Sequence, residues 1–145
     1  NYITEDVYYS GIQAQETGPN NTIDPESVPT LYLPVGQKVE IRLESRDVIH
    51  SFWIVDFLYK KDMIPGKTNY WYFIPEKVGS YSGKCAELCG EFHSLMLFNV
   101  EVVSQAEYDE YIESLRAEGN VGRLGPEFNT NTNLPGTTGE TEEVE

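Results

Sequence analysis

The segment CAELCGEFHSLM, residues 85–96, concentrates the soft metal ligands of this 145-residue chain. Cys85, Cys89, His93 and Met96 comprise both of its cysteines, one of its two histidines and one of its two methionines. Thiolate, imidazole and thioether are the ligands that select copper, and a loop between two strands can bring such side chains together. The segment therefore predicts a copper site on a loop.

The second histidine, His50, lies on a separate stretch of β-branched and aromatic residues, 48–55, which a β-sandwich can place beside this loop. A single copper ion needs only one thiolate, as in sites with two His, one Cys and a weak axial Met. Two thiolates, two imidazoles and one thioether instead suit two copper ions bridged by both sulfurs. Such a centre would rearrange little on reduction, which favours electron transfer over bond-making chemistry.

Each residue also has a simpler interpretation. Outside the cytoplasm, Cys85 and Cys89 are an alternative disulfide pair. A lone histidine usually serves as a hydrogen-bonding residue, and Met96 alone would be core filler. A Cys₂His₂ zinc site is a further alternative, but zinc-binding histidines usually come closely spaced, whereas the two here are 43 residues apart. The combination of all five side chains favours copper.

The surrounding sequence predicts an all-β fold. Residues 38–45 alternate strictly between charged and apolar side chains, which is typical of a half-buried antiparallel strand. Several short strands separated by turns favour a sandwich or barrel. The other strands that we expect cover residues 6–12, 48–55, 69–74, 97–103 and a segment that follows the turn at 78–83.

The hydrophobic period changes after the last of these strands. Ser104 and Glu107 form a capping-box pattern, and apolar residues from Tyr108 to Leu115 recur at helical spacing. Beyond residue 120, Gly, Pro, Thr, Asn and Glu dominate, which predicts disorder. We therefore divide the chain into an N-terminal loop with an early strand (1–30), a metal-binding β-domain (31–104), a C-terminal helix (105–119) and a flexible, disordered acidic tail (120–145).

The charge of the chain restricts its partners. The sequence has 24 Asp and Glu against 10 Lys and Arg, a formal net charge of −14. This argues against binding nucleic acid or an anionic membrane surface, because phosphates require basic counterions. Residues 1–104 carry −6 of this charge and residues 105–145 carry −8. We expect only the first part to offer a compact docking face for a cationic partner.

No apolar run approaches the ~20 residues that a membrane-spanning helix needs. The sequence begins at Asn1 with neither an initiator Met nor a signal-peptide pattern. We interpret it as a processed or excised piece, and we expect any targeting segment or anchor to precede Asn1.

The loop, together with VIHSFW (48–53), KKDMIPG (60–66) and VGSYSG (78–83), resembles the binuclear copper (CuA) domain of cytochrome c oxidase subunit II. The similarity covers residues 31–104 and rests on a C-x₃-C-x₃-H-x₂-M signature. It implies a cupredoxin-like Greek-key β-barrel or sandwich. It also implies an electron-transfer domain of an oxidoreductase on the outer side of a bacterial or mitochondrial membrane, which accepts electrons from cytochrome c and passes them to haem a of subunit I for oxygen reduction.

The resemblance implies a complete ligand set for two copper ions. The corresponding positions are Cys85 and Cys89 as bridging thiolates, His50 and Met96 on one ion, and His93 and the backbone carbonyl of Glu87 on the other. The side chain of Glu87 corresponds to a carboxylate that reaches Mg²⁺ at the boundary with subunit I, a hard ligand for a hard cation. The alternative for this side chain is a solvated loop carboxylate.

The resemblance also suggests where partners bind. Asp47 matches an acidic position used in cytochrome docking, and Asp56 and Glu91 are further docking candidates. Asp62 falls in the part of the family domain that faces subunit I. Asp47 and Asp62 could equally be ordinary surface carboxylates.

The chain departs from the family in three ways. The Trp-rich W-x-W stretch that supplies the electron-accepting Trp is missing, which leaves Trp53 and Trp71 as candidates, with core packing as the alternative for both. The family's two transmembrane helices are absent from this sequence. Val55 stands where many relatives have Pro, and we expect this difference to bend the backbone locally without touching the copper ligands.

Two other classes of protein compete with this interpretation. The CuA domain of nitrous-oxide reductase has Trp where Glu87 stands, and it belongs to a chain with a large propeller domain. A copper chaperone or storage module usually offers exposed Met and Cys side chains for easy release. A quinol-oxidase subunit shares the fold but lacks the copper ligands, all of which are present here.

Overall fold

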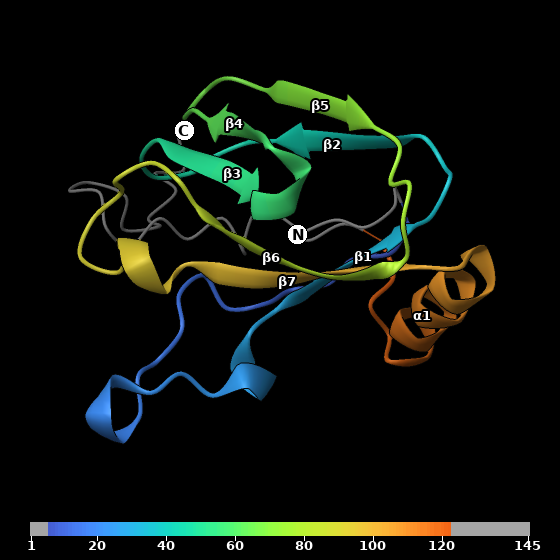
Figure 1. Cartoon of the computed structure of the whole chain (residues 1–145), viewed down its shortest axis with the longest axis horizontal. Coiled ribbons are helices and arrows are strands. Elements are labelled where there is room, and N and C mark those ends of the chain that lie inside the picture. Colours follow the sequence, from blue (N-terminus) through green and yellow to red (C-terminus); the bar gives the residue numbers. More distant parts are fainter. Residues whose placement is uncertain (1–5, 123–145) are drawn as a thin grey trace, which may run out of the picture.

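The computed structural model of the chain describes residues 6–122, which form two facing β-sheets and one α-helix (Figure 1). The larger sheet has the strand order β1-β7-β6-β3-β4, and the smaller sheet pairs β2 with β5. The all-β prediction is therefore confirmed. The strands are β1 (Thr30–Pro34), β2 (Val39–Leu43), β3 (His50–Ile54), β4 (Tyr59–Met63), β5 (Asn69–Phe73), β6 (Gly79–Cys85) and β7 (Leu97–Val103).

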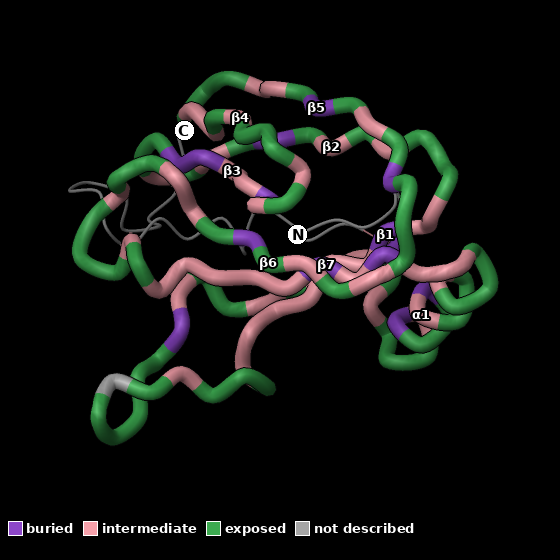
Figure 2. Tube along the Cα trace, viewed as in Figure 1, coloured by how far each residue is buried: buried purple, intermediate pink, exposed green. Residues whose placement is uncertain are grey.

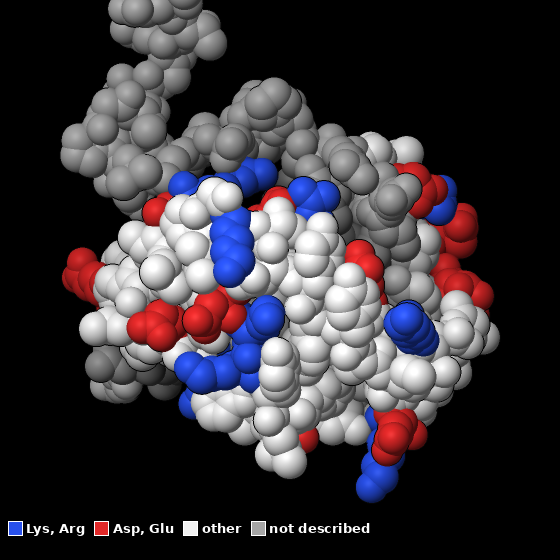
Figure 3. Space-filling view, turned by 90° about the horizontal axis from the view of Figure 1, so that it is seen from above, with Lys and Arg blue, Asp and Glu red and all other residues white. Residues whose placement is uncertain are grey.

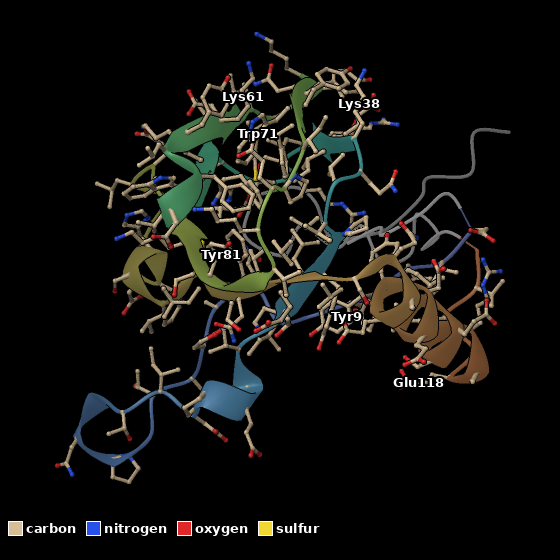
Figure 4. All side chains as sticks on the ribbon, turned by 45° about the vertical axis from the view of Figure 1, so that its right-hand side comes forward. Tyr9, Lys38, Lys61, Trp71, Tyr81 and Glu118 are labelled. Carbon is tan, nitrogen blue, oxygen red and sulfur yellow. The ribbon has the colours of Figure 1, made fainter. Side chains whose placement is uncertain are left out.

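The core lies between the two sheets, where apolar side chains alternate with exposed ones along each strand. In β2, Glu40 and Arg42 are exposed while Leu43 is buried, as the alternation in the sequence predicts. Ile41 pairs with Trp71 of β5, and Trp71 points toward the larger sheet (Figure 4). The buried core positions, which Figure 2 shows on both sheets, are Leu33, Ile54, Trp71, Val100 and Val102.

Aromatic side chains join the core to the strands that carry the metal-ligand candidates. Phe52 of β3 stacks on Phe98 of β7 with ring centroids 4.7 Å apart. The edge of Phe52 also meets Trp71, with centroids 6.1 Å apart. Offset and edge-to-face pairs of this kind stabilise a core beyond the area they bury.

Two features of the larger sheet differ from the expectations from sequence. β1 pairs with β7 in parallel, and β4 forms the edge of the sheet, although neither strand was expected. The strand expected over residues 6–12 is wrong: in that range the described structure has isolated bridge positions at Val7, which pairs with Val121, and at Tyr8, but no strand. Val7 is fully buried against the C-terminal helix, so its apolar character reflects packing and not sheet formation.

The helix α1 (Gln105–Ala117) follows β7 directly and has the predicted capping box. The Ser104 hydroxyl accepts from the Glu107 amide, and the Glu107 carboxylate accepts from the Ser104 amide. Ile112 and Leu115 pack on Val7, with Tyr9 beside them (Figure 4). The described part of the chain also contains four short 3₁₀ helices: η1 (Pro19–Asn21), η2 (Pro25–Ser27), η3 (Val55–Phe57) and η4 (His93–Leu95).

The loop from residue 86 to residue 96 lies at the end of the sandwich away from α1 (Figure 1). Within residues 6–122, no helix combines the length and apolarity that crossing a membrane requires. The acidic tail expected over 120–145 lies, from residue 123 onward, outside the described residues.

We predict that Gly83→Ala lowers the free energy of unfolding by about 1–3 kcal/mol, the usual cost of overpacking a core. A Cβ atom at this position would lie 2.1 Å from Cε2 and Cζ of Phe98, whose ring is held by its stack on Phe52. Urea unfolding measures the change. The exposed neighbour Ser82→Ala is the control, and Phe98→Leu added to Gly83→Ala should restore part of the loss. An unchanged unfolding midpoint for Gly83→Ala would contradict this packing.

Candidate metal centre

The metal loop, residues 86–96, is anchored by hydrogen bonds to the strands on either side of it. Cys85 ends β6, and its amide donates to the carbonyl of Met96 at 3.0 Å. The amide of Ala86 donates to the carbonyl of Ser51 on β3 at 2.9 Å. Because Phe52 pairs with Cys85 across the β3–β6 ladder, the start of β3 and the end of β6 lie side by side.

A tight turn folds the loop back over its own cysteines. Gly90 has a φ of +125°, a backbone conformation that side-chain-bearing residues rarely adopt. Its carbonyl accepts from the amide of His93 at 3.2 Å, which starts η4. The turn thereby returns His93 and Met96 toward Cys89, four and seven residues earlier in the chain.

The side chains expected as copper ligands converge around the two sulfurs. Sγ of Cys85 lies 3.6 Å from Sγ of Cys89. Nδ1 of His50 lies 3.7 Å from the Cys85 sulfur, and Nδ1 of His93 lies 3.4 Å from the Cys89 sulfur. Sδ of Met96 is 3.4 Å from the Cys89 sulfur. The five side chains therefore form one contact cluster.

The backbone carbonyl of Glu87 also belongs to this cluster, 3.2 Å from the Cys85 sulfur. Both cysteines are free, and their separation far exceeds the ~2.05 Å of a disulfide bond. Within the described residues, His50, Cys85 and Cys89 form a group whose ligand atoms all lie within 4.8 Å of one another.

The two thiols have opposite pKa shifts. Burial raises the pKa of Cys85, but backbone hydrogen bonds at Glu87 and Ser51 and the contact with His50 outweigh it and bring the pKa to about 7. Burial and the neighbouring Cys85 together raise the pKa of Cys89 to about 11. Without a cation, the cluster therefore favours one thiolate and one thiol, because two adjacent negative charges repel each other.

His50 is held from its far side by Asp47. Nε2 of His50 lies 2.8 Å from Oδ1 of Asp47, which leaves Nδ1 directed at the Cys85 sulfur. Burial lowers the pKa of His50, but the bonds to Asp47 and Cys85 outweigh it, so that the pKa is raised. A carboxylate behind a ligating imidazole is the usual device for fixing its tautomer and orientation.

This contact shows a role for Asp47 that sequence reasoning missed. The resemblance predicts a docking or ordinary surface carboxylate, yet the side chain is only 23% exposed and also accepts from the Ser45 hydroxyl at 3.1 Å. The only signal in the sequence was its position three residues before His50, and that spacing is uninformative without the fold.

The remaining candidates lie away from the sulfurs or on the surface. Trp71 is 8% exposed in the core, which agrees with the packing alternative for this residue. Trp53 is half-buried on the outer face of β3, with Nζ of Lys84 5.0 Å from its ring centroid. Asp56, Asp62, Glu87 and Glu91 are exposed.

Comparisons with known proteins agree with the geometry of the cysteine–histidine cluster, because they match this chain to one protein family. The sequence family described as cytochrome c oxidase subunit II, periplasmic domain, matches residues 5–103. A probable cytochrome c oxidase subunit 2 of Streptomyces coelicolor is 55% identical over 94 residues, which cover 65% of this chain and 30% of that protein. Cytochrome c oxidase subunit 2 of Mycobacterium tuberculosis is 38% identical over 117 residues, which cover 76% and 31%.

A solved structure supports the fold. The periplasmic domain of subunit II of cytochrome oxidase from Bradyrhizobium japonicum matches with a TM-score of 0.59 and 32% identity, over 61% of this chain and 64% of that one. The predicted fold class is thereby confirmed. The chain spans about 30% of the length of the curated relatives it matches. With a family match over residues 5–103 and the cysteine–histidine cluster within it, the chain belongs to the family of the periplasmic domain of cytochrome c oxidase subunit II.

Proposed function

We propose that this domain is the electron-transfer domain of a haem-copper oxidase, in which a binuclear CuA centre receives single electrons from cytochrome c and delivers them to haem a of subunit I for the reduction of oxygen to water. One observation carries the proposal: two cysteine sulfurs lie 3.6 Å apart, each with the Nδ1 atom of its own histidine beside it. Membership of the subunit II family supports the same function.

The donor set fits two copper ions better than one. The cluster divides into two halves, with His50 beside Cys85 and His93 beside Cys89. A further weak donor lies near each sulfur, the Glu87 carbonyl at Cys85 and the Met96 thioether at Cys89. Because both sulfurs would be shared by the two ions, nearness to one sulfur does not assign a donor to an ion, and the pairing of His50 with Met96 and of His93 with the Glu87 carbonyl stays a prediction. A single tetrahedral zinc ion would leave the thioether without a role, whereas soft sulfur ligands select copper.

Two copper ions bound here would supply a one-electron redox centre shared across both sulfurs. The protein contributes the negative charge of the two thiolates and a rigid placement of the ligand side chains. The two thiolates would neutralise part of the metal charge, since binding requires both to lose their protons. β3, β6 and the turn at Gly90 hold the ligands in place before any metal arrives, which limits rearrangement when an electron is gained or lost.

Partners of the domain would meet it close to the metal loop. Leu88 and Phe92 on this loop are 78% and 55% exposed, and exposed apolar side chains gathered at one place mark binding surfaces. The exposed carboxylates of Glu87 and Glu91 flank them, and Asp56 is a further docking candidate. An apolar centre with an acidic rim would suit a cationic cytochrome c.

The rest of the described surface is less uniform in charge than the net −14 suggests. On the face shown in Figure 3, basic and acidic side chains are interspersed with uncharged ones.

Subunit I would contact the side of β4 that carries Asp62. The Glu87 carboxylate would share Mg²⁺ with ligands from that subunit, because a hard cation takes several oxygen ligands. The domain would then stand on the outer face of the membrane, with the half-buried Trp53 as the aromatic through which electrons arrive.

We predict that the full chain binds two copper ions and turns purple, with a seven-line hyperfine pattern from one electron shared by two metals. Cys85→Ser and Cys89→Ser should each abolish the two-metal site, because a hydroxyl is a poor bridging ligand. Metal analysis and electron paramagnetic resonance measure both results.

Met96→Leu is the matched control for the cysteine variants, because it removes a sulfur from the same loop but only a weak ligand. It should keep two coppers and shift the redox potential. One copper per chain with a four-line pattern in the wild-type protein, or a cysteine variant with both coppers and an unchanged spectrum, would refute the binuclear assignment.

We predict that the metal-free protein is alkylated first at Cys85. A thiol reacts as its thiolate, which is populated above its pKa. With pKa values of about 7 and about 11, Cys85 should react with iodoacetamide much faster than Cys89 at pH 8, and its rate should fall as the pH drops below 7. Peptide mass spectrometry after short exposure distinguishes the two sites. Equal labelling at pH 8 would contradict the asymmetry.

A further inference from the structure

The N-terminal segment crosses the metal loop before it enters the sandwich. The amide of Gln15 donates to the carbonyl of Leu95 at 2.9 Å, and its side-chain Nε2 donates to the carbonyl of Leu97 at 3.4 Å. These two carbonyls lie on either side of Met96, whose own carbonyl accepts from Cys85. The backbone around Met96 is therefore held on both sides.

Gln15 is deeply buried, with 2% of its surface exposed. Its Oε1 atom has no hydrogen-bond partner among the described residues, and burying an unbonded amide oxygen is unfavourable. The two bonds that its nitrogens make, one to Leu95 on the metal loop and one to Leu97 at the start of β7, supply the reason for its position.

The same segment reaches the histidine on the other side of the cluster. Nε2 of Gln13 donates to Oδ2 of Asp47 at 3.4 Å. The other oxygen of this carboxylate, Oδ1, lies 2.8 Å from Nε2 of His50. Asp47 is therefore fixed between an imidazole on one oxygen and an amide on the other.

We propose that residues 13–15, the N-terminal clip, position two copper ligands that lie on different elements. Gln13 orients His50 through Asp47, and Gln15 orients Met96 through the carbonyls of its two neighbours. Both glutamines are positioning residues, since neither touches the place where the sulfurs converge. The proposal rests on the proposed function for the identity of the metal, although the hydrogen bonds themselves belong to the metal-free chain.

A double-mutant cycle on the copper-loaded full chain tests the Gln13 arm. The variants are Gln13→Ala, Asp47→Ala and the two combined, and the measurement is the rate of copper loss to a chelator, followed by the purple absorption. Loss of a carboxylate behind a ligating histidine typically weakens metal binding by about 10–100-fold. We expect Asp47→Ala to speed copper loss within that range and Gln13→Ala to speed it by a smaller factor.

The decisive comparison is between the effect of Gln13→Ala in the wild-type chain and its effect in the Asp47→Ala variant. If Gln13 acts through Asp47, Gln13→Ala has no further effect once Asp47 is alanine, because the pair is coupled. Gln105→Ala is the matched control, since it also removes an amide-to-carboxylate bond, from Gln105 to Asp109 at 2.8 Å on α1. A wild-type rate in Gln13→Ala, or factors that multiply independently in the double variant, would overturn the proposal.

Measurements without copper separate the clip from the proposed function. In the metal-free chain, Gln13→Ala should shift the ¹⁵N resonances of the His50 ring, and Gln15→Leu should speed hydrogen exchange at the Cys85 amide, which is bonded to Met96. The unfolding midpoint of Gln13→Ala should match that of Gln105→Ala, since both sites are exposed. Failure to bind two coppers would refute the function alone, whereas unchanged resonances and exchange would refute the clip alone.

Discussion

The close approach of two thiols in a partly buried loop is the constraint on which the rest of this structure depends. Two like charges about 4 Å apart repel by about 4 kcal/mol at the effective dielectric of a protein surface. The Cys85 and Cys89 sulfurs are 3.6 Å apart, and burial together with the neighbouring Cys85 raises the pKa of the Cys89 thiol. Bound cations reverse the sign of the interaction, so the arrangement is unfavourable as a dithiolate and favourable as a metal site.

The pairing of β3 with β6 places Cys85 for this approach and also places an aromatic side chain in the core. The register that sets Phe52 against Cys85 also sends Phe52 into the core against Phe98 and Trp71. Gly83, two residues before Cys85, is needed because the Phe98 ring occupies the space that a side chain would fill. Core packing and sulfur placement are thus coupled, and a change that moves β6 in the core also moves a ligand.

Features that depend on local sequence could be predicted, and features that depend on distant pairing could not. The ligand loop, the alternation in β2 and the capping box at Ser104 and Glu107 are each contained in a few consecutive residues. The parallel pairing of β1 with β7 joins residues about seventy positions apart, and no local pattern encodes it.

The early strand expected over 6–12 failed for a related reason. An apolar residue such as Val7 looks the same in sequence whether it packs on a helix or joins a sheet. The convergence of His50 on the loop is intermediate, because its β-rich surroundings predict a strand, while only the register shows which neighbour that strand has.

The position of Asp47 shows that not every carboxylate near the metal loop is available to attract a partner. A carboxylate that orients a buried imidazole must stay fixed and largely shielded, whereas one that attracts a partner must reach solvent. Asp47 is committed on both oxygens, to His50 on one side and Gln13 on the other, so it serves the first purpose. In the proposed function, docking would then rest on carboxylates that remain exposed on the metal loop, Glu87 and Glu91. Because these carboxylates are neighbours of the exposed Leu88 and Phe92 in the sequence, long-range attraction and apolar contact would act on the same loop that carries Cys89.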